Sequence, residues 1–163
     1  MSKYSIEIKW AIAFVVMSLI WMLGEKLLGL HSEHIDKHLI YTNLIAIPAI
    51  AVYVLGLMDK RKNYYNGYMT YKQGFVTGLI ITLIVAVLSP LTQYITSIFI
   101  TPEYFPNAIK HAVSTGNSTQ AEAEKFFSLH NYMVQGLIGA FIMGIITSAI
   151  VAYFTKSKTK TSA

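Results

Sequence analysis

The sequence predicts an all-α, polytopic membrane protein whose four transmembrane helices pack as two antiparallel hairpins. Three observations predict this fold class. First, 54% of the 163 residues are apolar and only 13% are charged, about half the charge of an ordinary soluble domain. Second, four apolar stretches are each long enough to cross a bilayer core, which takes about 20 helical residues. Third, the basic residues gather in the connections between these stretches, as in the topology signals of membrane proteins.

The same composition argues against several other classes of protein. So little charge cannot cover the surface of a small water-soluble domain, which argues against a soluble enzyme, a disordered chain and a nucleic-acid-binding domain. The chain has no cysteine, so it contains no disulfide and no thiolate metal site. It contains no nucleophile elbow, P-loop or HExxH motif. We therefore expect a non-enzymatic protein, with residues 1–163 as a single membrane domain and the lipid bilayer as its partner.

The first predicted span covers residues 8–30, and the second covers residues 39–58. Glu25 and Lys26 interrupt the first span near its end, and the second span carries Asn43. Because the first apolar run is long and no Ala-x-Ala site follows it, we interpret it as an uncleaved helix rather than a signal peptide.

The third predicted span covers residues 74–100, and the fourth covers residues 132–154. Ser89-Pro90 lies inside the third span. Proline cannot donate the helical hydrogen bond, so we predict a kink at Pro90. A straight helix over this span would reach about 40 Å, which exceeds the bilayer core and also favours a bend or tilt.

The longest connection is residues 101–131, which we expect to contain two short helices. Pro106 suits the first turn of one helix, and Gly116 suits its end. Thr119-Gln-Ala-Glu122 fits a capping box that starts a second helix running toward His130.

The distribution of basic residues predicts the orientation of the chain. Nine of the 13 Lys and Arg residues lie at the two chain ends and between the second and third spans, and four lie in the other two connections. Cytoplasmic segments are enriched in Lys and Arg, so we expect both termini to be cytoplasmic. The nine are Lys3, Lys9, Lys60, Arg61, Lys62, Lys72, Lys156, Lys158 and Lys160.

Small side chains recur at every fourth position in the third and fourth spans. Residues four apart share a helix face, and flat faces let two backbones approach closely in lipid. We expect the two faces to meet in a tight hairpin; the alternative is that one of them forms a dimer interface. The third span carries Gly74, Gly78, Thr82, Ala86 and then Pro90, and the fourth carries Gly136, Ala140, Gly144, Ser148 and Ala152.

Three amide side chains lie in the spans, at Asn43, Gln93 and Gln135. Gln93 comes one helical turn after Pro90. Buried amides in lipid usually hydrogen-bond one helix to another, and we expect that role here. The alternative is that Pro90, Gln93 and Asn43 line a polar pathway.

The sequence HSEHIDKH brings together three of the five histidines. If this stretch is helical, His31, His34 and His38 share a face and can bind zinc or copper. A proton-sensing role is a second interpretation, because imidazole titrates near neutral pH. The third is a polar collar at the outer surface, without any bound ion.

Glu25 is the one acidic residue that we expect inside the outer edge of the membrane. With Lys9 at the inner boundary, the helix between them reaches only about 24 Å. A carboxylate at that depth needs a partner, and we expect Lys37 or one of the loop histidines.

Several strings of the chain resemble a bacterial family of small four-helix membrane proteins that is catalogued only as a domain of unknown function. The resemblance covers nearly the whole chain and implies four spans and a bacterial inner-membrane location. It implies no activity, substrate or functional residue. The strings are KYSIEIKW, GLHSEHIDKH, DKRKNYYNGYMTYKQGF, LSPLTQYI, TPEYFPN and GIITSAIVAYF.

Three functions remain open from the sequence. We favour an accessory or scaffold subunit that pairs with itself or joins a larger membrane complex, because few ionisable groups lie inside the spans. The first alternative is a transport or channel unit that is active as an oligomer. The second is an outer-face metal or pH sensor that uses the histidines, the only interpretation that involves a cofactor, zinc or copper.

Overall fold

The computed structural model describes residues 4–157, and every regular element in that range is helical. Lys3, Lys158 and Lys160, which entered the orientation argument, lie outside the described residues. The elements are α1 (Ser5–Leu27), η1 (Ile35–Lys37), α2 (His38–Tyr41), η2 (Thr42–Ile45), α3 (Ala46–Asn63), α4 (Tyr71–Ile95), the π-helical η3 (Thr96–Ile100), α5 (Tyr104–Ser114), α6 (Gln120–Phe126) and α7 (Leu129–Thr155).

The predicted fold class is confirmed. Four segments are long and apolar enough to cross a membrane, and each overlaps one predicted span. The second span starts earlier than predicted because η1, α2 and η2 continue directly into α3. The four segments are Ser5–Leu27, Ile35–Asn63, Tyr71–Ile100 and Leu129–Thr155.

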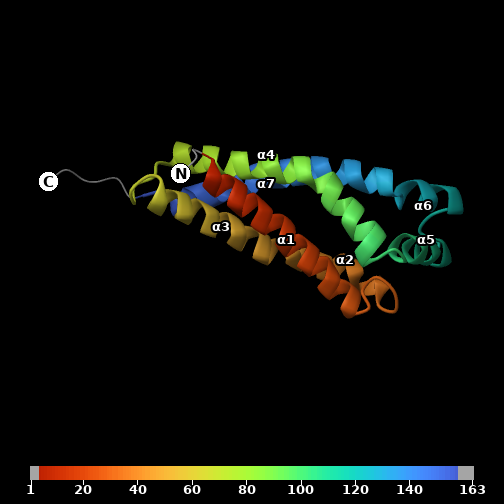
Figure 1. Cartoon of the computed structure of the whole chain (residues 1–163). Helices are drawn as coiled ribbons and strands as arrows, with labels where there is room; N and C mark the ends of the chain where they lie inside the picture. Colours follow the sequence, from red (N-terminus) through yellow and green to blue (C-terminus); the bar gives the residue numbers. More distant parts are fainter. Residues whose placement is uncertain (1–3, 158–163) are drawn as a thin grey trace.

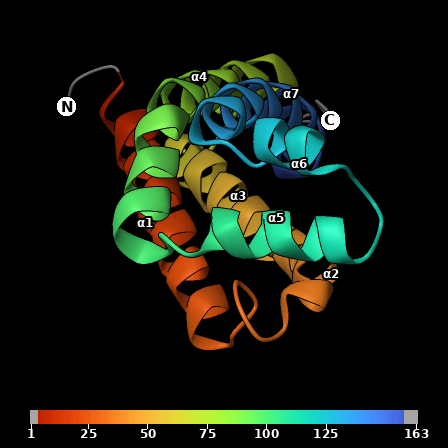
Figure 2. The same ribbon diagram turned by 90° about the vertical axis from the view of Figure 1, so that its right-hand side faces the viewer.

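The spans form two antiparallel hairpins, α1 with α3 and α4 with α7. Figure 1 shows α4 and α7 running side by side above α1 and α3, with both chain ends at one end of the bundle. At the opposite end, α5 lies across the bundle, as the end-on view shows (Figure 2). We refer to these as the termini end and the α5 end.

The most extensive helix contact joins α4 and α7, along the predicted faces of small residues. A Cβ added at Gly78 would lie 2.5 Å from the Ser148 hydroxyl, and one at Gly144 would lie 2.5 Å from the Thr82 hydroxyl. The Thr82 and Ser148 hydroxyls lie 3.3 Å apart and are buried. These contacts place the two backbones too close for larger side chains, as expected for glycine-mediated packing in lipid.

The close contact ends before Gly136, which the sequence had assigned to the same face. A Cβ at Gly136 would meet nothing within 4 Å, whereas one at Gly74, at the other end of α4, would lie 3.3 Å from Ala152 Cβ. The reason is the bend of α4, which leaves α7 in its second half and runs toward the end of α1 (Figure 1). The predicted close packing of Gly136 is therefore not formed: Gly136 lies on the predicted face but is separated from α4 by a cavity that it lines together with Ser89 and Gln93.

Pro90 and Ser89 explain how α4 bends without exposing an unpaired carbonyl to lipid. Pro90 has no N–H for the carbonyl of Ala86, four residues earlier. The hydroxyl of Ser89 donates to that carbonyl instead, at 2.9 Å. Beyond the bend, Lys26 Nζ at the end of α1 donates to the carbonyl of Ile100 at 2.5 Å, which ties α4 to α1.

At the termini end, charged groups pair with one another between α1 and α3. Lys60 Nζ and Glu7 Oε1 lie 2.8 Å apart, and both side chains are buried. Asp59 accepts hydrogen bonds from Lys9 and from the indole of Trp10. Because charges at a membrane boundary need partners, these two pairs fix the depth and rotation of α1 against α3.

The connection between α4 and α7 follows the predicted turn and capping signals. Gly116 has a φ of +73° just after α5, a conformation that favours glycine. Thr119 and Glu122 form the predicted capping box at the start of α6, and the hydrogen bonds from Thr119 lower the pKa of Glu122. The second helix ends at Phe126, short of His130.

The α4–α7 contact predicts opposite effects for one substitution at two glycines of α7. Gly144→Leu forces a side chain into Thr82 and should lower stability by about 2–3 kcal/mol, a fall of about 5–10 °C in the melting temperature in detergent. Gly139→Leu should leave it unchanged, because a Cβ at Gly139 meets nothing within 4 Å. Equal melting temperatures of the two variants would contradict the packing.

The role of Ser89 predicts a non-additive pair of substitutions. Ser89→Ala alone leaves the Ala86 carbonyl without a donor and should cost about 1–2 kcal/mol. In a Pro90→Ala background, the new N–H of residue 90 takes that carbonyl, so Ser89→Ala should have little effect. A double-mutant cycle on unfolding in detergent measures this coupling; additive effects would show that the serine hydroxyl does not replace the missing bond.

Candidate metal centre

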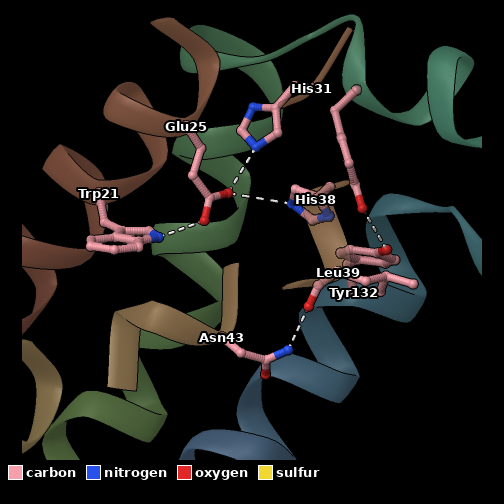
Figure 3. Close-up of polar contacts among 8 residues, drawn as sticks. Trp21, Glu25, His31, His38, Leu39, Asn43 and Tyr132 are labelled. Atoms are coloured by element: carbon pink, nitrogen blue, oxygen red, sulfur yellow. Dashed lines mark hydrogen bonds and ion pairs between the residues drawn. The ribbon is translucent and has the colours of Figure 1, made fainter. Parts of the chain in front are cut away.

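Glu25, His31 and His38 meet at the α5 end of the bundle, from three successive segments of the chain (Figure 3). Glu25 Oε2 lies 3.0 Å from His31 Nε2 and 3.3 Å from His38 Nε2. One ligand atom from each residue lies within 4.8 Å of the other two. The side chains of Glu25 and His31 are 3% and 1% exposed, and that of His38 is 13% exposed.

The end of α1 turns the chain so that His31 returns toward Glu25. Gly29 has a φ of +72°, and its N–H donates to the carbonyl of Lys26 at 2.9 Å. The N–H of Leu30 donates to the carbonyl of Glu25 at 3.0 Å. This pair of bonds is a Schellman motif, in which glycine takes the left-handed position after the helix. Leu30, the residue after the turn, is buried, and His31 follows it in sequence.

A second reversal brings His38 to the same point. The N–H of His34 donates to the carbonyl of Gly29 at 2.8 Å, which closes the loop. The short η1 follows, and His38 is the first residue of α2. The imidazole of His38 therefore projects from the start of a helix toward a carboxylate on the last turns of another.

Trp21 holds the carboxylate from the other side. Its indole Nε1 donates to Glu25 Oε1 at 2.5 Å, from one helical turn earlier on α1. Glu25 thus presents Oε1 to the indole and Oε2 to the two imidazoles (Figure 3), which fixes the rotamer of the carboxylate.

Helix α5 covers the two imidazoles. The ring of Tyr104 lies 5.2 Å from that of His31 and 5.1 Å from that of His38, between ring centres. Asn107 donates to the backbone carbonyl of His31 at 2.9 Å, and the Tyr104 and Tyr132 hydroxyls lie 3.2 Å apart. Burial raises the pKa of Tyr104, and Tyr132 and the charge of Glu25 add to the shift, so its hydroxyl stays protonated.

The donor set matches the ligands and spacing of a zinc site. In a tetrahedral site with bonds of about 2.0–2.1 Å, neighbouring ligand atoms lie about 3.3 Å apart, close to the distances from Glu25 Oε2 to the two imidazoles. His38 Nε2 is buried and its nearest charged partner is Glu25 Oε2 at 3.3 Å, a separation that also suits two ligands of one zinc ion. A carboxylate with two imidazoles is also a known zinc-binding combination that leaves a fourth position open.

The structure brings together only two of the three predicted histidines. His34 is exposed, and its ring lies near Gly29, 3.5 Å from the position of an added Cβ. The prediction assumed a continuous helix, but residues 28–34 form turns, so the helical spacing of His34 does not apply. Glu25 takes its place, which agrees with the prediction that this carboxylate has a histidine partner.

Tyr104 and Trp21 were not among the predicted site residues. Trp21 could have been found, since it lies four residues before Glu25 and shares its helix face. Tyr104 comes from a helix that lies far along the chain, and no local pattern indicates its contact with the histidines.

The predicted polar residues of the spans lie elsewhere and bond within their own segments. Asn43 donates to the carbonyl of Leu39 at 2.5 Å (Figure 3), and Gln93 donates to the hydroxyl of Ser97 at 2.9 Å. The expected hydrogen bonds between helices are therefore not formed by these two amides. Gln93 does line a cavity of about 170 Å³ together with Ser89, whereas Asn43 does not.

Two cavities reach the cluster from different sides. The apolar cavity, about 520 Å³, touches Glu25 and is lined by Met17, Trp21, Gly24, Leu28, Leu44 and Pro48 among others. The α5 cavity, about 310 Å³, touches His38 and is lined by Asp36, Tyr104, His111, Ser118, Phe126 and Phe127 among others.

Comparison with known proteins places the chain in a family. No curated protein and no solved structure matches it. The match to the family model covers residues 9–157, nearly the whole length of the chain, and that family is described as "Protein of unknown function (DUF4199)". The resemblance noted from the sequence is thereby confirmed, and the chain belongs to the DUF4199 family.

Proposed function

We propose that this protein is a metal-responsive membrane protein that binds one divalent transition-metal ion, zinc by its chemistry, at Glu25, His31 and His38. One observation carries the proposal: a buried carboxylate oxygen lies within 3.3 Å of two imidazole nitrogens. A buried carboxylate requires a compensating positive charge, and within residues 4–157 its side-chain polar partners are the two imidazoles and the indole of Trp21.

Zinc suits this donor set better than the other common ions. Magnesium and calcium select oxygen ligands, whereas two of the three donors here are imidazoles. Copper(II) favours a square-planar arrangement of ligands. Zinc accepts three protein ligands in a tetrahedral arrangement and takes water at the fourth position.

The proposed role is sensing rather than catalysis, because the ligands link three separate segments of the chain. Glu25 ends a transmembrane helix, His31 lies in a turn, and His38 begins the next span. Tyr104 and Asn107 of α5 rest on the same residues. Binding of an ion would draw these segments together. The position of α5 at the membrane surface would then depend on whether the metal site is occupied.

The proposal includes an orientation and a location. The excess of Lys and Arg at the termini end supports a cytoplasmic position for both termini. The α5 end, and with it the metal site, would then face the outer side of the bacterial inner membrane.

Metal binding by purified protein in detergent tests the proposal. We expect about one zinc ion per chain by equilibrium dialysis and elemental analysis. Glu25→Gln, His31→Ala and His38→Ala should each weaken binding at least tenfold, because even loss of an outer-sphere partner costs about 10–100-fold. Protons compete for imidazole nitrogens, so affinity should also fall on acidification.

His34→Ala is the matched control for that experiment. His34 lies in the same loop but outside the group of three ligands, so its removal should leave zinc affinity unchanged. Equal zinc binding by the wild type and by the variant that lacks Glu25, His31 and His38 side chains would refute the metal site.

A role as an accessory subunit is a second candidate, supported by one observation on α7. Where α4 bends away, a Cβ added at Gly139 would meet nothing within 4 Å. Glycine inside a helix costs about 0.5–1 kcal/mol relative to alanine, and Gly139 has no close packing partner among the described residues. A helix of a second copy or of a larger membrane complex would fit against it.

The oligomeric state in a mild detergent tests this second candidate. We expect Gly139→Leu to convert an oligomer to a monomer, measured by light scattering after size exclusion, while the melting temperature stays constant. Gly144→Leu is the comparison, since it acts within the chain. A wild-type protein that is monomeric both in mild detergent and in lipid nanodiscs would exclude self-association through this face.

A further inference from the structure

We propose that the α5 cavity is the route by which the metal ion reaches its ligands, with Asp36 and His111 as transient ligands on the way to His38. This inference rests on the proposed metal site and adds a path, a direction and two residues to it. The three residues come from η1, α5 and α2, and all line one cavity of about 310 Å³.

The exposure of the three ligands points to His38 as the first to meet the ion. The Glu25 and His31 side chains are 3% and 1% exposed, while that of His38 is 13% exposed. His38 is also the ligand that lines the α5 cavity. An ion that arrives from this cavity therefore meets the His38 side chain before the other two ligands, although the Nε2 atom itself is buried and faces Glu25.

The apolar cavity is the other opening onto the cluster, and its chemistry excludes a divalent ion. It reaches Glu25 between α1 and the start of the second span, and its walls are leucine, methionine, isoleucine and proline side chains apart from Trp21, Glu25 and Tyr41. Removing a charge from water without polar partners is strongly unfavourable. An ion that entered this cavity would therefore lose its water without replacement ligands before it reached Glu25.

The α5 cavity is lined by side chains that can bind a cation, which the apolar cavity lacks apart from Glu25. Asp36 is exposed at its wall, where a carboxylate raises the local concentration of cations. His111 is half-buried in the opposite wall, on α5. Its imidazole offers the same donor type as His38, so a zinc ion can exchange water for nitrogen ligands stepwise as it moves inward.

Aromatic side chains line the α5 cavity next to the proposed ligands. Tyr104, whose ring packs on those of both His31 and His38, also lines the α5 cavity together with Phe127. The rate of loading should therefore depend on this cavity even where the final affinity does not.

A kinetic experiment on single-cysteine variants tests the route, because the chain has no cysteine of its own. Ser118→Cys places a thiol in the wall of the α5 cavity, where a bulky maleimide would block it. Leu28→Cys does the same in the apolar cavity. Ser114→Cys, exposed on α5 and outside both cavities, controls for labelling of this helix.

The fluorescence of Trp21 provides the signal for metal binding. The chain has two tryptophans, and in a Trp10→Phe background the remaining indole donates directly to Glu25. Binding of Co²⁺, a paramagnetic substitute for zinc, should quench its fluorescence. Stopped-flow mixing then gives the loading rate, and dialysis with elemental analysis gives the amount bound at equilibrium.

We expect maleimide at Ser118→Cys to slow Co²⁺ loading at least tenfold, and labelling at Leu28→Cys or Ser114→Cys to leave the rate unchanged. Without any label, His111→Ala and Asp36→Asn should each slow loading several-fold while the amount bound stays the same.

Two results would overturn the route. One is an unchanged loading rate when the α5 cavity is blocked, and the other is slower loading only when the apolar cavity is blocked. Either result leaves the metal site standing, since the unlabelled protein still binds Co²⁺. An unlabelled wild type that binds neither Co²⁺ nor zinc at equilibrium would instead refute the site and the route together.

Discussion

The bend of α4 at Pro90 is the constraint on which the rest of the structure depends. Before the bend, glycines and hydroxyl side chains let α4 and α7 approach so closely that Thr82 and Ser148 contact each other across the interface. After it, α4 and η3 run to the end of α1, where Lys26 donates to the carbonyl of Ile100. The two hairpins are therefore closely packed at the termini end and diverge at the other (Figure 1). Helix α5 lies across this second end (Figure 2), next to the histidine loop.

The bend is possible in lipid only because no backbone group loses its partner. A membrane interior offers no water to an orphaned carbonyl, so the proline needs a neighbour that can donate in its place. Ser89 is that neighbour. The π-helical turn at residues 96–100 then ends with the N–H of Thr101 bonded to the carbonyl of Thr96 at 2.8 Å, so the departure from α-helical geometry also keeps its hydrogen bonds.

Each end of the bundle contains a buried carboxylate, Glu7 or Glu25, and the groups that pair with it differ between the two ends. At the termini end, Glu7 and Asp59 pair with lysines. At the α5 end, Glu25 faces imidazoles, although Lys26 is its neighbour in sequence and turns instead to Ile100 and Glu103. Imidazoles can exchange a proton for a metal ion, so only this end has a carboxylate whose partner is exchangeable.

The sequence by itself determined the features that depend on local chemistry. Length and hydropathy set the four spans, the spacing of small residues set the register of α4 against α7, and Thr119 with Glu122 set the start of α6. The tertiary structure alone decided which histidines meet. Helical spacing predicted that His34 belongs to the site. Gly29 instead adopts a positive φ just after α1, and the turns that follow place His31 next to Glu25. The contact of Tyr104 with both imidazoles depends on where a helix from a distant part of the chain comes to lie. Local sequence patterns cannot predict this contact. It depends on the bend of α4 and on the path of the connection between α4 and α7.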